Sequence, residues 1–201
     1  MTKPTMRPTL VAAAAALALA VPGAAQASTL DGLSGCAGDV TTAAYARWLD
    51  PGQYVQAPDG GFEQGGAGWT FAGGAGVVAG NEPFGVDGGG MRSLRIPAGG
   101  SAISPATCVG IGSPTLRFLA RSGGLLPLQV SVRLAGTSLW LPVLVPVLAT
   151  ASWQPTLPLP FLANALALPT STGTTRVQFR LAAIGAAWSV DDVDVDPYKW
   201  K

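Results

Sequence analysis

Alternation of apolar and polar side chains is the feature that most limits how this chain folds. Leu128, Val130, Val132 and Leu134 alternate with polar residues, and the same period of two runs through 176–181. Such a period places every second side chain on one face of a strand, so each segment predicts a half-buried strand. The 27 glycines and 17 prolines disfavour helices and supply turns. The pattern predicts an all-β protein, an antiparallel β-sandwich of the jelly-roll type.

Short strands with Gly-rich or Pro-containing links between them are expected along the rest of the chain. Their ranges are 69–72, 76–79, 93–96, 102–104, 115–121, 153–159 and 188–195. The strongly hydrophobic stretch 139–168 contains five prolines, which rule out a continuous helix. Only 40–49 is helix-like, with Asp39 as a candidate N-cap and Asp50-Pro51-Gly52 as the stop.

The first 27 residues have the composition of a secretory signal peptide. Lys3 and Arg7 precede an apolar run over 10–21, and Ala25-Gln26-Ala27 supplies small residues at the cleavage site. A membrane-spanning helix needs about 20 residues, so the run predicts a leader cut after Ala27 and no membrane span. The protein is expected to be secreted, with an N-terminal extension at 28–60 and a β-sandwich domain at 61–198.

Cys36 and Cys108 are the two cysteines of the chain. In an exported protein such a pair predicts one disulfide, which would tie the extension to the sandwich and stabilise the fold by about 4 kcal/mol. The alternative is a lipoprotein, because Leu33-Ser34-Gly35-Cys36 has the form of a lipidation box. Polar residues over 26–32 separate that box from the apolar run, which favours the disulfide.

Missing residue types exclude several functions. The chain has no histidine, so it cannot build a Ser-His-Asp or Cys-His nucleophile or an imidazole metal site. Once Lys3 and Arg7 are left out, the chain has 10 basic and 11 acidic side chains. This near-neutral balance lacks the excess of basic residues that is typical of nucleic-acid binding. Glu63, Glu82 and Asp87 are not set in a convincing catalytic pair. These observations predict that the protein is not an enzyme.

A Gly-Phe-Glu start at 61–63 and an Asp-Asp-Val finish at 191–193 frame the β region. This frame resembles carbohydrate-binding modules with a galactose-binding-like jelly roll. The resemblance implies a structural Ca²⁺ shared by Glu63 with Asp191 or Asp192, if the first and last strands pair. Carboxylate and carbonyl oxygens suit that hard cation. Alternatively, the aspartates of 191–196 solvate an edge strand and block edge-to-edge pairing.

The chain after the leader also resembles a group of actinobacterial secreted single-domain proteins of unknown function. The segments that carry this resemblance are 48–51, Tyr54, 61–63, 80–84, 107–110, 114–118, 152–155 and the Asp-Asp-Val ending. This second resemblance implies no activity.

Several arginines and glutamines fall at the outward phases of their strands. They are Arg117, Gln129, Arg133, Arg176, Gln178 and Arg180. If their strands share a sheet, they form a face rich in guanidinium groups, which suit carboxylates, phosphates and sulfates. Trp69, Trp140 and Trp153 are candidate rings for sugar stacking. The alternatives are a solvated outer face and buried tryptophans.

The predicted function is therefore a secreted, non-catalytic module that binds carbohydrate, such as an extracellular or cell-wall glycan, or an anionic cell-envelope polymer. The alternative is a secreted structural or protein-interaction β-sandwich.

Overall fold

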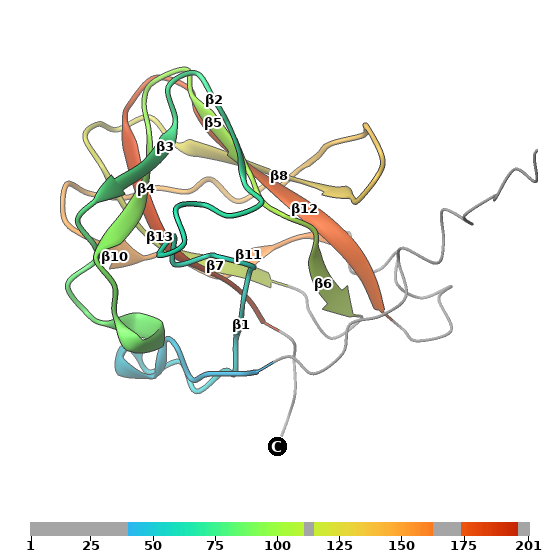
Figure 1. Cartoon of the computed structure of the whole chain (residues 1–201), viewed down its shortest axis with the longest axis horizontal. Coiled ribbons are helices and arrows are strands. Elements are labelled where there is room, and N and C mark those ends of the chain that lie inside the picture. The colour runs from blue at the N-terminus through green and yellow to red at the C-terminus, as the bar shows by residue number, and fades with distance from the viewer. Residues whose placement is uncertain (1–39, 111–114, 163–173, 197–201) are drawn as a thin grey trace, which may run out of the picture.

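The protein is a two-layer β-sandwich in the computed structural model, which describes residues 40–110, 115–162 and 174–196 (Figure 1). The strands are β1 (Val55–Gln56), β2 (Thr70–Ala72), β3 (Gly76–Ala79), β4 (Arg92–Ile96), β5 (Ser101–Ile103), β6 (Thr107–Gly110), β7 (Thr115–Ser122), β8 (Leu128–Leu134), β9 (Leu141–Pro142), β10 (Gln154–Pro155), β11 (Leu159–Pro160), β12 (Thr174–Ala183) and β13 (Trp188–Val195). The predicted all-β fold class is confirmed.

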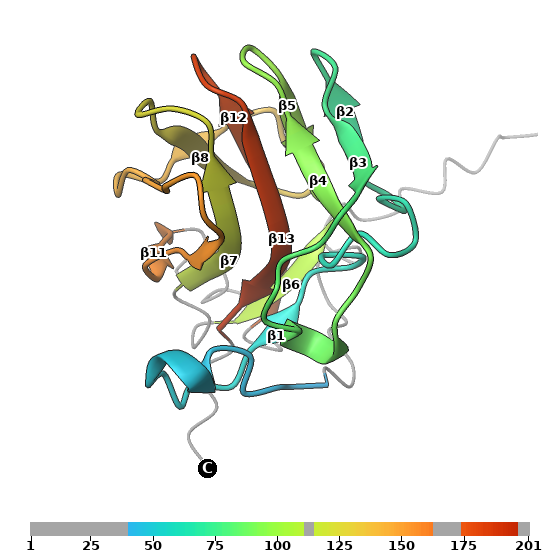
Figure 2. The ribbon, with the colours of Figure 1, turned by 90° about the vertical axis from the view of Figure 1, so that its left-hand side faces the viewer.

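Each layer is an antiparallel sheet built around one long C-terminal strand. The β13 sheet has the order β10-β7-β13-β4-β3, with β1 on β13 and β11 on β7. The β12 sheet has the order β2-β5-β12-β8-β9, with β6 on β12. Figure 2 shows the β12–β13 turn at one end of the sandwich and the two short helices at the opposite end. Because β12 and β13 are central, their inward side chains meet in the core.

The core lies between the sheets and follows the predicted alternation. Val177, Phe179 and Leu181 of β12 are fully buried, and the inward residues of β8 pack beside them. Burying one such side chain stabilises a fold by about 1.5–3 kcal/mol. Strands β3, β8 and β13 have the predicted bounds, whereas 153–159 divides into β10 and the start of β11. Pro155 and Pro158 explain this division, because proline has no backbone N–H to donate to the ladder.

Strand β13 contains a bulge at the point where two consecutive aspartates interrupt the alternation of its sequence. Asp191 pairs with Leu119 and Asp194 with Arg117, so three steps along β13 match two steps along β7. One extra residue therefore sits in β13, and Asp192 there has a positive φ of 45°. As a result Val190 and Val193 both belong to the core although they are three residues apart.

The segment from Thr42 to Tyr54, here called the N-terminal segment, covers the outer face of the β13 sheet. Tyr45 and Tyr54 are buried there against Leu119, with their ring centroids 4.7 Å apart. The predicted helix at 40–49 is wrong in extent, because only the 3₁₀ turn η1 (Ala46–Trp48) forms. A helix of ten residues is marginal by itself, and here Thr42 pairs with Tyr54 as an antiparallel bridge. A second 3₁₀ turn, η2 (Val86–Gly88), lies beside the segment.

Several predictions fall outside the described residues. These are the leader over 1–27, the N-cap Asp39, and Cys36 with its disulfide or lipid; its predicted partner Cys108 lies in β6. Strand β1 lies within the predicted extension 28–60 and pairs with β13. Within the described ranges, no helix is both long and apolar enough to span a bilayer.

Candidate functional site

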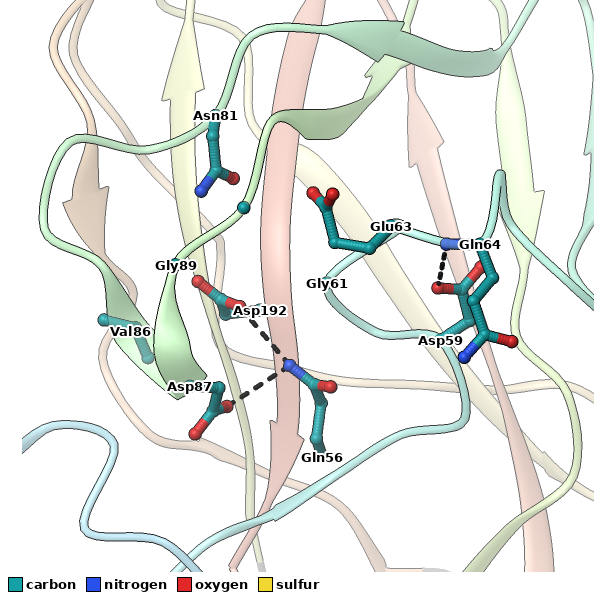
Figure 3. A pocket seen from close by; sticks show the side chains of 11 residues that line it. Gln56, Asp59, Gly61, Glu63, Gln64, Asn81, Val86, Asp87, Gly89 and Asp192 are labelled. Carbon is teal, nitrogen blue, oxygen red and sulfur yellow. Dashed lines mark hydrogen bonds between the residues drawn. The ribbon is translucent and has the colours of Figure 1, made fainter.

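A polar cavity of about 150 Å³ opens beside the bulge of β13 (Figure 3). It lies between the segment that follows β1, the loop from β3 to β4, and β13 itself. Its lining residues are Gln56, Asp59, Gly61, Glu63, Gln64, Asn81, Val86, Asp87, Gly89, Gly90 and Asp192. Four of these side chains are carboxylates and three are amides, so the cavity is rich in oxygen ligands.

Asp192 enters the cavity because the bulge redirects it. The side chain is 5% exposed, and its Oδ1 accepts a hydrogen bond of 3.3 Å from the Gln56 amide. Its Oδ2 is buried and has no hydrogen-bond partner within the described part of the chain. Burial, together with the negative charges of Asp191 and Asp87, raises the pKa of Asp192 to about 9. A cation placed here would remove both penalties.

Glu63 reaches the cavity from the opposite side. Its Oε1 accepts hydrogen bonds of 2.8 Å from the backbone N–H groups of Met91 and Arg92. Gly90 permits this approach, because a Cβ at that position would lie 2.3 Å from Glu63 Oε1. The sequence therefore needs glycine at residue 90 to hold the carboxylate in place.

Asp87 is a cavity carboxylate that the sequence analysis did not assign to the metal site. One of its oxygens accepts a 2.6 Å hydrogen bond from the Thr42 hydroxyl, and the other accepts 3.3 Å from the Gln56 amide. Gln56 thus bridges Asp87 and Asp192, as Figure 3 shows. The available signal was an aspartate inside the glycine-rich run 85–90, whereas nothing in the sequence identified Gln56.

The structure separates the two aspartates that were predicted together. Asp191 is fully buried outside the cavity lining, and its Oδ2 accepts a 3.4 Å hydrogen bond from the N–H of Glu82. Burial raises its pKa to about 8. The proposed ligand pair is therefore Glu63 with Asp192, and Asp191 does not share the cavity. The solvated-edge alternative is wrong for 191–194, because β13 is central and its aspartates are buried.

The oxygen donors of the cavity suit a hard cation, but these side chains alone do not complete a metal centre. Across the described ranges, no three His, Cys, Asp or Glu side chains form a group that could hold a metal ion. Ca²⁺ takes six to eight oxygen ligands, including carbonyls, amides and waters. Glu63 and Asp192 would supply charge, and the unpartnered Oδ2 of Asp192 is the oxygen that most needs a ligand.

A second candidate site lies on the outer face of the β12 sheet. Five of the six predicted polar residues share this face: Gln129 and Arg133 from β8, and Arg176, Gln178 and Arg180 from β12. In the register, Gln178 pairs with Arg133 and Ala182 with Gln129. Gln129 and Arg180 are exposed, and the other three are half-buried. The predicted shared face therefore forms.

Arg133 is held in a defined position on this face. Its guanidinium carbon lies 4.5 Å from the ring centroid of Trp140. Its Nε and one terminal nitrogen donate to Gln178 Oε1 at 3.1 and 2.9 Å, while the Gln178 amide donates to the carbonyl of Ser104 at 3.0 Å. Arg133, Gln178 and Trp140 thus form one connected group, which we call the Trp140 platform.

Arg117 must be removed from the predicted face. It lies in β7 of the other sheet and is 7% exposed. The N-terminal segment covers it: Asp50 forms a salt bridge with its guanidinium group, whose central carbon lies 4.3 Å from the Tyr45 ring centroid. Its outward phase was predicted correctly, but the covering layer depends on tertiary contacts that strand periodicity does not reveal.

Trp69 is also misassigned as a ligand-stacking ring. It is 7% exposed, packs on Phe62 at 5.0 Å between ring centroids, and donates its indole N–H to the carbonyl of Pro58 at 3.0 Å. It is a core residue. Trp153 is half-buried, with Arg121 over its ring at 5.0 Å. Of the two tryptophans assigned to the ligand site, the structure places only Trp140 beside the arginine face.

Comparison with known proteins finds structural neighbours at low sequence identity. No protein-family model matches the sequence, and no curated protein matches it. A family 61 carbohydrate-binding module in complex with β-1,4-galactotriose is 16% identical, with a TM-score of 0.43 over 70% of this chain and 96% of that one. The CBM22-1 xylan-binding domain of Paenibacillus barcinonensis Xyn10C is 17% identical, with a TM-score of 0.46 over 73% and 99%.

A protein of another kind is equally similar. The K1 cleaved adhesin domain of Lys-gingipain from Porphyromonas gingivalis is 16% identical, with a TM-score of 0.42 over 67% of this chain and 94% of that one. At these identities and TM-scores, the ligands named for the neighbours are not assigned to this chain. The resemblance to actinobacterial secreted proteins stays a prediction.

Proposed function

We propose that this protein is a non-catalytic binding module that holds an acidic glycan on the outer face of its β12 sheet. The observation that carries the proposal is the Trp140 platform, in which one guanidinium group is fixed between an indole ring and an amide. Fixing the side chain beforehand lowers the entropy lost when a ligand binds. The exposed Arg180 and Gln129 extend the same polar surface.

The chemistry of this face favours a carboxylated or sulfated sugar polymer. Guanidinium groups bind such anions through paired N–H donors, and an indole face accepts the apolar face of a pyranose ring. Arg176, Gln178 and Arg180 point outward at every second residue of β12, so they span about 13 Å. That length lets the face contact a short oligosaccharide. If the predicted leader directs export, the glycan is extracellular or part of the cell wall.

Ca²⁺ in the cavity has a structural role in this proposal. Glu63 and Asp192 would hold it, with Asp87 beside them and neutral oxygens from Gln56 and Asn81. The ion would supply positive charge where burial and neighbouring carboxylates raise the pKa of Asp192. It would thereby fasten the segment after β1 and the β3–β4 loop onto β13.

The same cavity is poorly suited to sugar hydrolysis. Small-molecule sites have volumes of roughly 300–1,000 Å³, whereas this cavity holds about 150 Å³. An ion fits that space better than a pyranose ring flanked by an acid and a base. We expect no turnover of chromogenic glycosides, and hydrolysis that disappears in a Glu63→Gln variant would contradict the non-catalytic assignment.

A glycan array probed in the presence of calcium and of a chelator tests the binding function. We expect acidic glycans to be retained, with signals that fall as salt is added because exposed charges are screened. Trp140→Ala and Arg133→Ala should each weaken retention by at least roughly tenfold, about 1.4 kcal/mol. Arg92→Ala is the matched control, since this exposed arginine lies on the other sheet. Equal losses in all three variants, or no retained glycan, would refute the proposal.

A further inference from the structure

Two neighbouring loops project from the end of the sandwich opposite the two short helices (Figure 2). The first, residues 123–127, joins β7 to β8, and the second, residues 184–187, joins β12 to β13. Gly123 donates its N–H to the carbonyl of Ala187 at 3.1 Å. Leu126 lies against Gly185, where an added Cβ would be 2.2 Å from Leu126 Cδ1. The loops therefore form one packed surface.

Large apolar side chains stand exposed on this surface. Leu125 is 95% exposed, Ile184 62% and Leu126 52%. We call these three residues the apolar tip. Neither loop contains a charged residue or a polar side chain. Leaving apolar side chains clustered in water is unfavourable, and such clusters mark surfaces that contact a partner or a membrane.

Two arginines flank the apolar tip on the β13 sheet. Arg95 of β4 and Arg121 of β7 are both exposed, and both pair with Ser189 of β13, one residue beyond Trp188 at the start of that strand. They lie on either side of β13, close to the loop 184–187.

Acidic side chains are kept away from this end. Those in the described ranges are Asp50, Asp59, Glu63, Glu82, Asp87, Asp191, Asp192, Asp194 and Asp196. None belongs to the two loops or to the residues paired with Trp188 and Ser189, and Asp191, the next acid along β13, is fully buried. The end of the sandwich therefore combines exposed leucine and isoleucine with positive charge alone.

We propose that the apolar tip inserts into the surface of a bilayer that contains anionic lipid. Protruding apolar side chains can enter the boundary between headgroups and acyl chains, and basic residues just behind them pair with lipid phosphates. The arrangement of the two features fits this partner. The apolar groups are outermost, and Arg95 and Arg121 lie beside Ser189, the second residue of β13. The apolar tip shares no residue with the Trp140 platform, so substitutions in the tip leave the platform residues unchanged.

Vesicle co-sedimentation of the purified protein tests this proposal. Vesicles of phosphatidylcholine with phosphatidylglycerol should retain the protein, and vesicles of phosphatidylcholine alone should retain it more weakly. A Leu125→Ser, Ile184→Ser variant should lose roughly tenfold or more of its partitioning into anionic vesicles, because buried apolar area contributes to binding. Arg95→Gln with Arg121→Gln should remove the preference for anionic lipid.

Leu157→Ser is the matched control, because Leu157 is 72% exposed and lies outside both loops. It should bind vesicles as the unmodified protein does. Circular dichroism and retained glycan binding would show that the serine variants are folded, and they keep this test separate from that of the glycan proposal. The proposal is overturned if the unmodified protein ignores anionic vesicles, or if the double serine variant sediments as well as the control.

Discussion

The Tyr45 hydroxyl donates a 2.8 Å hydrogen bond to Oδ2 of Asp194, a residue 149 positions later in the chain. Both side chains are fully buried, and the bond joins the N-terminal segment to the central strand β13. Burial raises the pKa of Asp194 well above its usual range, while the hydrogen bond from Tyr45 lowers it. This contact is therefore a main attachment of the segment that covers the β13 sheet.

Removing this hydroxyl should loosen the covering layer. We expect Tyr45→Phe to lower the free energy of unfolding by about 1–3 kcal/mol, because a buried carboxyl loses its donor. Denaturant titration followed by circular dichroism measures the loss. Tyr54→Phe is the matched control, since its hydroxyl donates to Asp50, which is only part-buried. A smaller loss is expected there, and equal losses would argue against a special role for the Asp194 contact.

Calcium should stabilise the protein through the cavity. A saturating ion raises the free energy of unfolding by about 2.7 kcal/mol at a hundredfold excess over its Kd. Gly90→Ala should weaken this effect, because the new methyl group would displace Glu63. Gly76→Ala is the control, as a Cβ there meets nothing within 4 Å. Thermal melts with calcium and with EDTA compare the variants, and an unchanged calcium response in Gly90→Ala would contradict the assigned ligand.

The metal-free protein should become less stable as the pH rises. Asp191 and Asp192 have ordinary pKa values of 3.8 when unfolded, and burial raises these to about 8 and about 9 in the folded chain. Between those values the folded state holds protons that the unfolded state has released, so raising the pH favours unfolding. The stability that these two carboxyl groups contribute is fully present below about pH 4 and is lost as the pH rises toward about 9.

Melting temperatures measured in EDTA across this pH range test the sign. Calcium should flatten the curve, because the ion binds the deprotonated carboxylate. Asp192→Asn should also reduce the slope, since it removes one of the aspartates whose pKa is raised by folding. A metal-free melting temperature that climbs with pH would be incompatible with the raised pKa values.

Truncating Trp69 and Trp140 should affect stability and glycan binding to different extents. Trp69→Ala is expected to cost about 3–5 kcal/mol of unfolding free energy, because it empties a core position. Trp140→Ala should cost less than about 1 kcal/mol while weakening glycan retention, since this ring lies at the half-buried edge of the platform. Chemical denaturation separates the two effects. Comparable destabilisation by both substitutions would remove Trp140 from the ligand site.

The predicted disulfide has a direct test. Mass spectrometry of the unreduced protein should find Cys36 and Cys108 in one linked peptide pair. Reduction should then lower the free energy of unfolding by about 4 kcal/mol, since it releases a loop of roughly 70 residues. Two free thiols, or a lipid on Cys36, would contradict this prediction.

Local patterning predicted the strands of this protein better than it predicted their surroundings. The period of two placed β8 and β13 at their observed bounds and put Arg133, Gln178 and Arg180 on one face. The same pattern did not indicate that a separate segment covers Arg117, because that covering depends on contacts between residues that are far apart in the sequence.

The candidate metal site was predictable only in part. A Gly-Phe-Glu start and an Asp-Asp-Val finish indicated Glu63 and one of two aspartates, and both Glu63 and Asp192 line the cavity. Choosing between Asp191 and Asp192 required the bulge, whose single sequence signal is the three-residue spacing from Val190 to Val193. Gln56 and Asp87 come from other elements and join the cavity only when the chain is folded.

The extra residue in β13 makes the cavity separable from the scaffold. A shortened chain without Asp192 would return the strand to strict alternation, with Trp188, Val190, Val193 and Val195 still facing inward. The hydrophobic frame would keep its register on β7, while the cavity would lose its buried carboxylate. Deleting this one residue should therefore give a sandwich that no longer binds the ion and whose surface can be redesigned for other ligands.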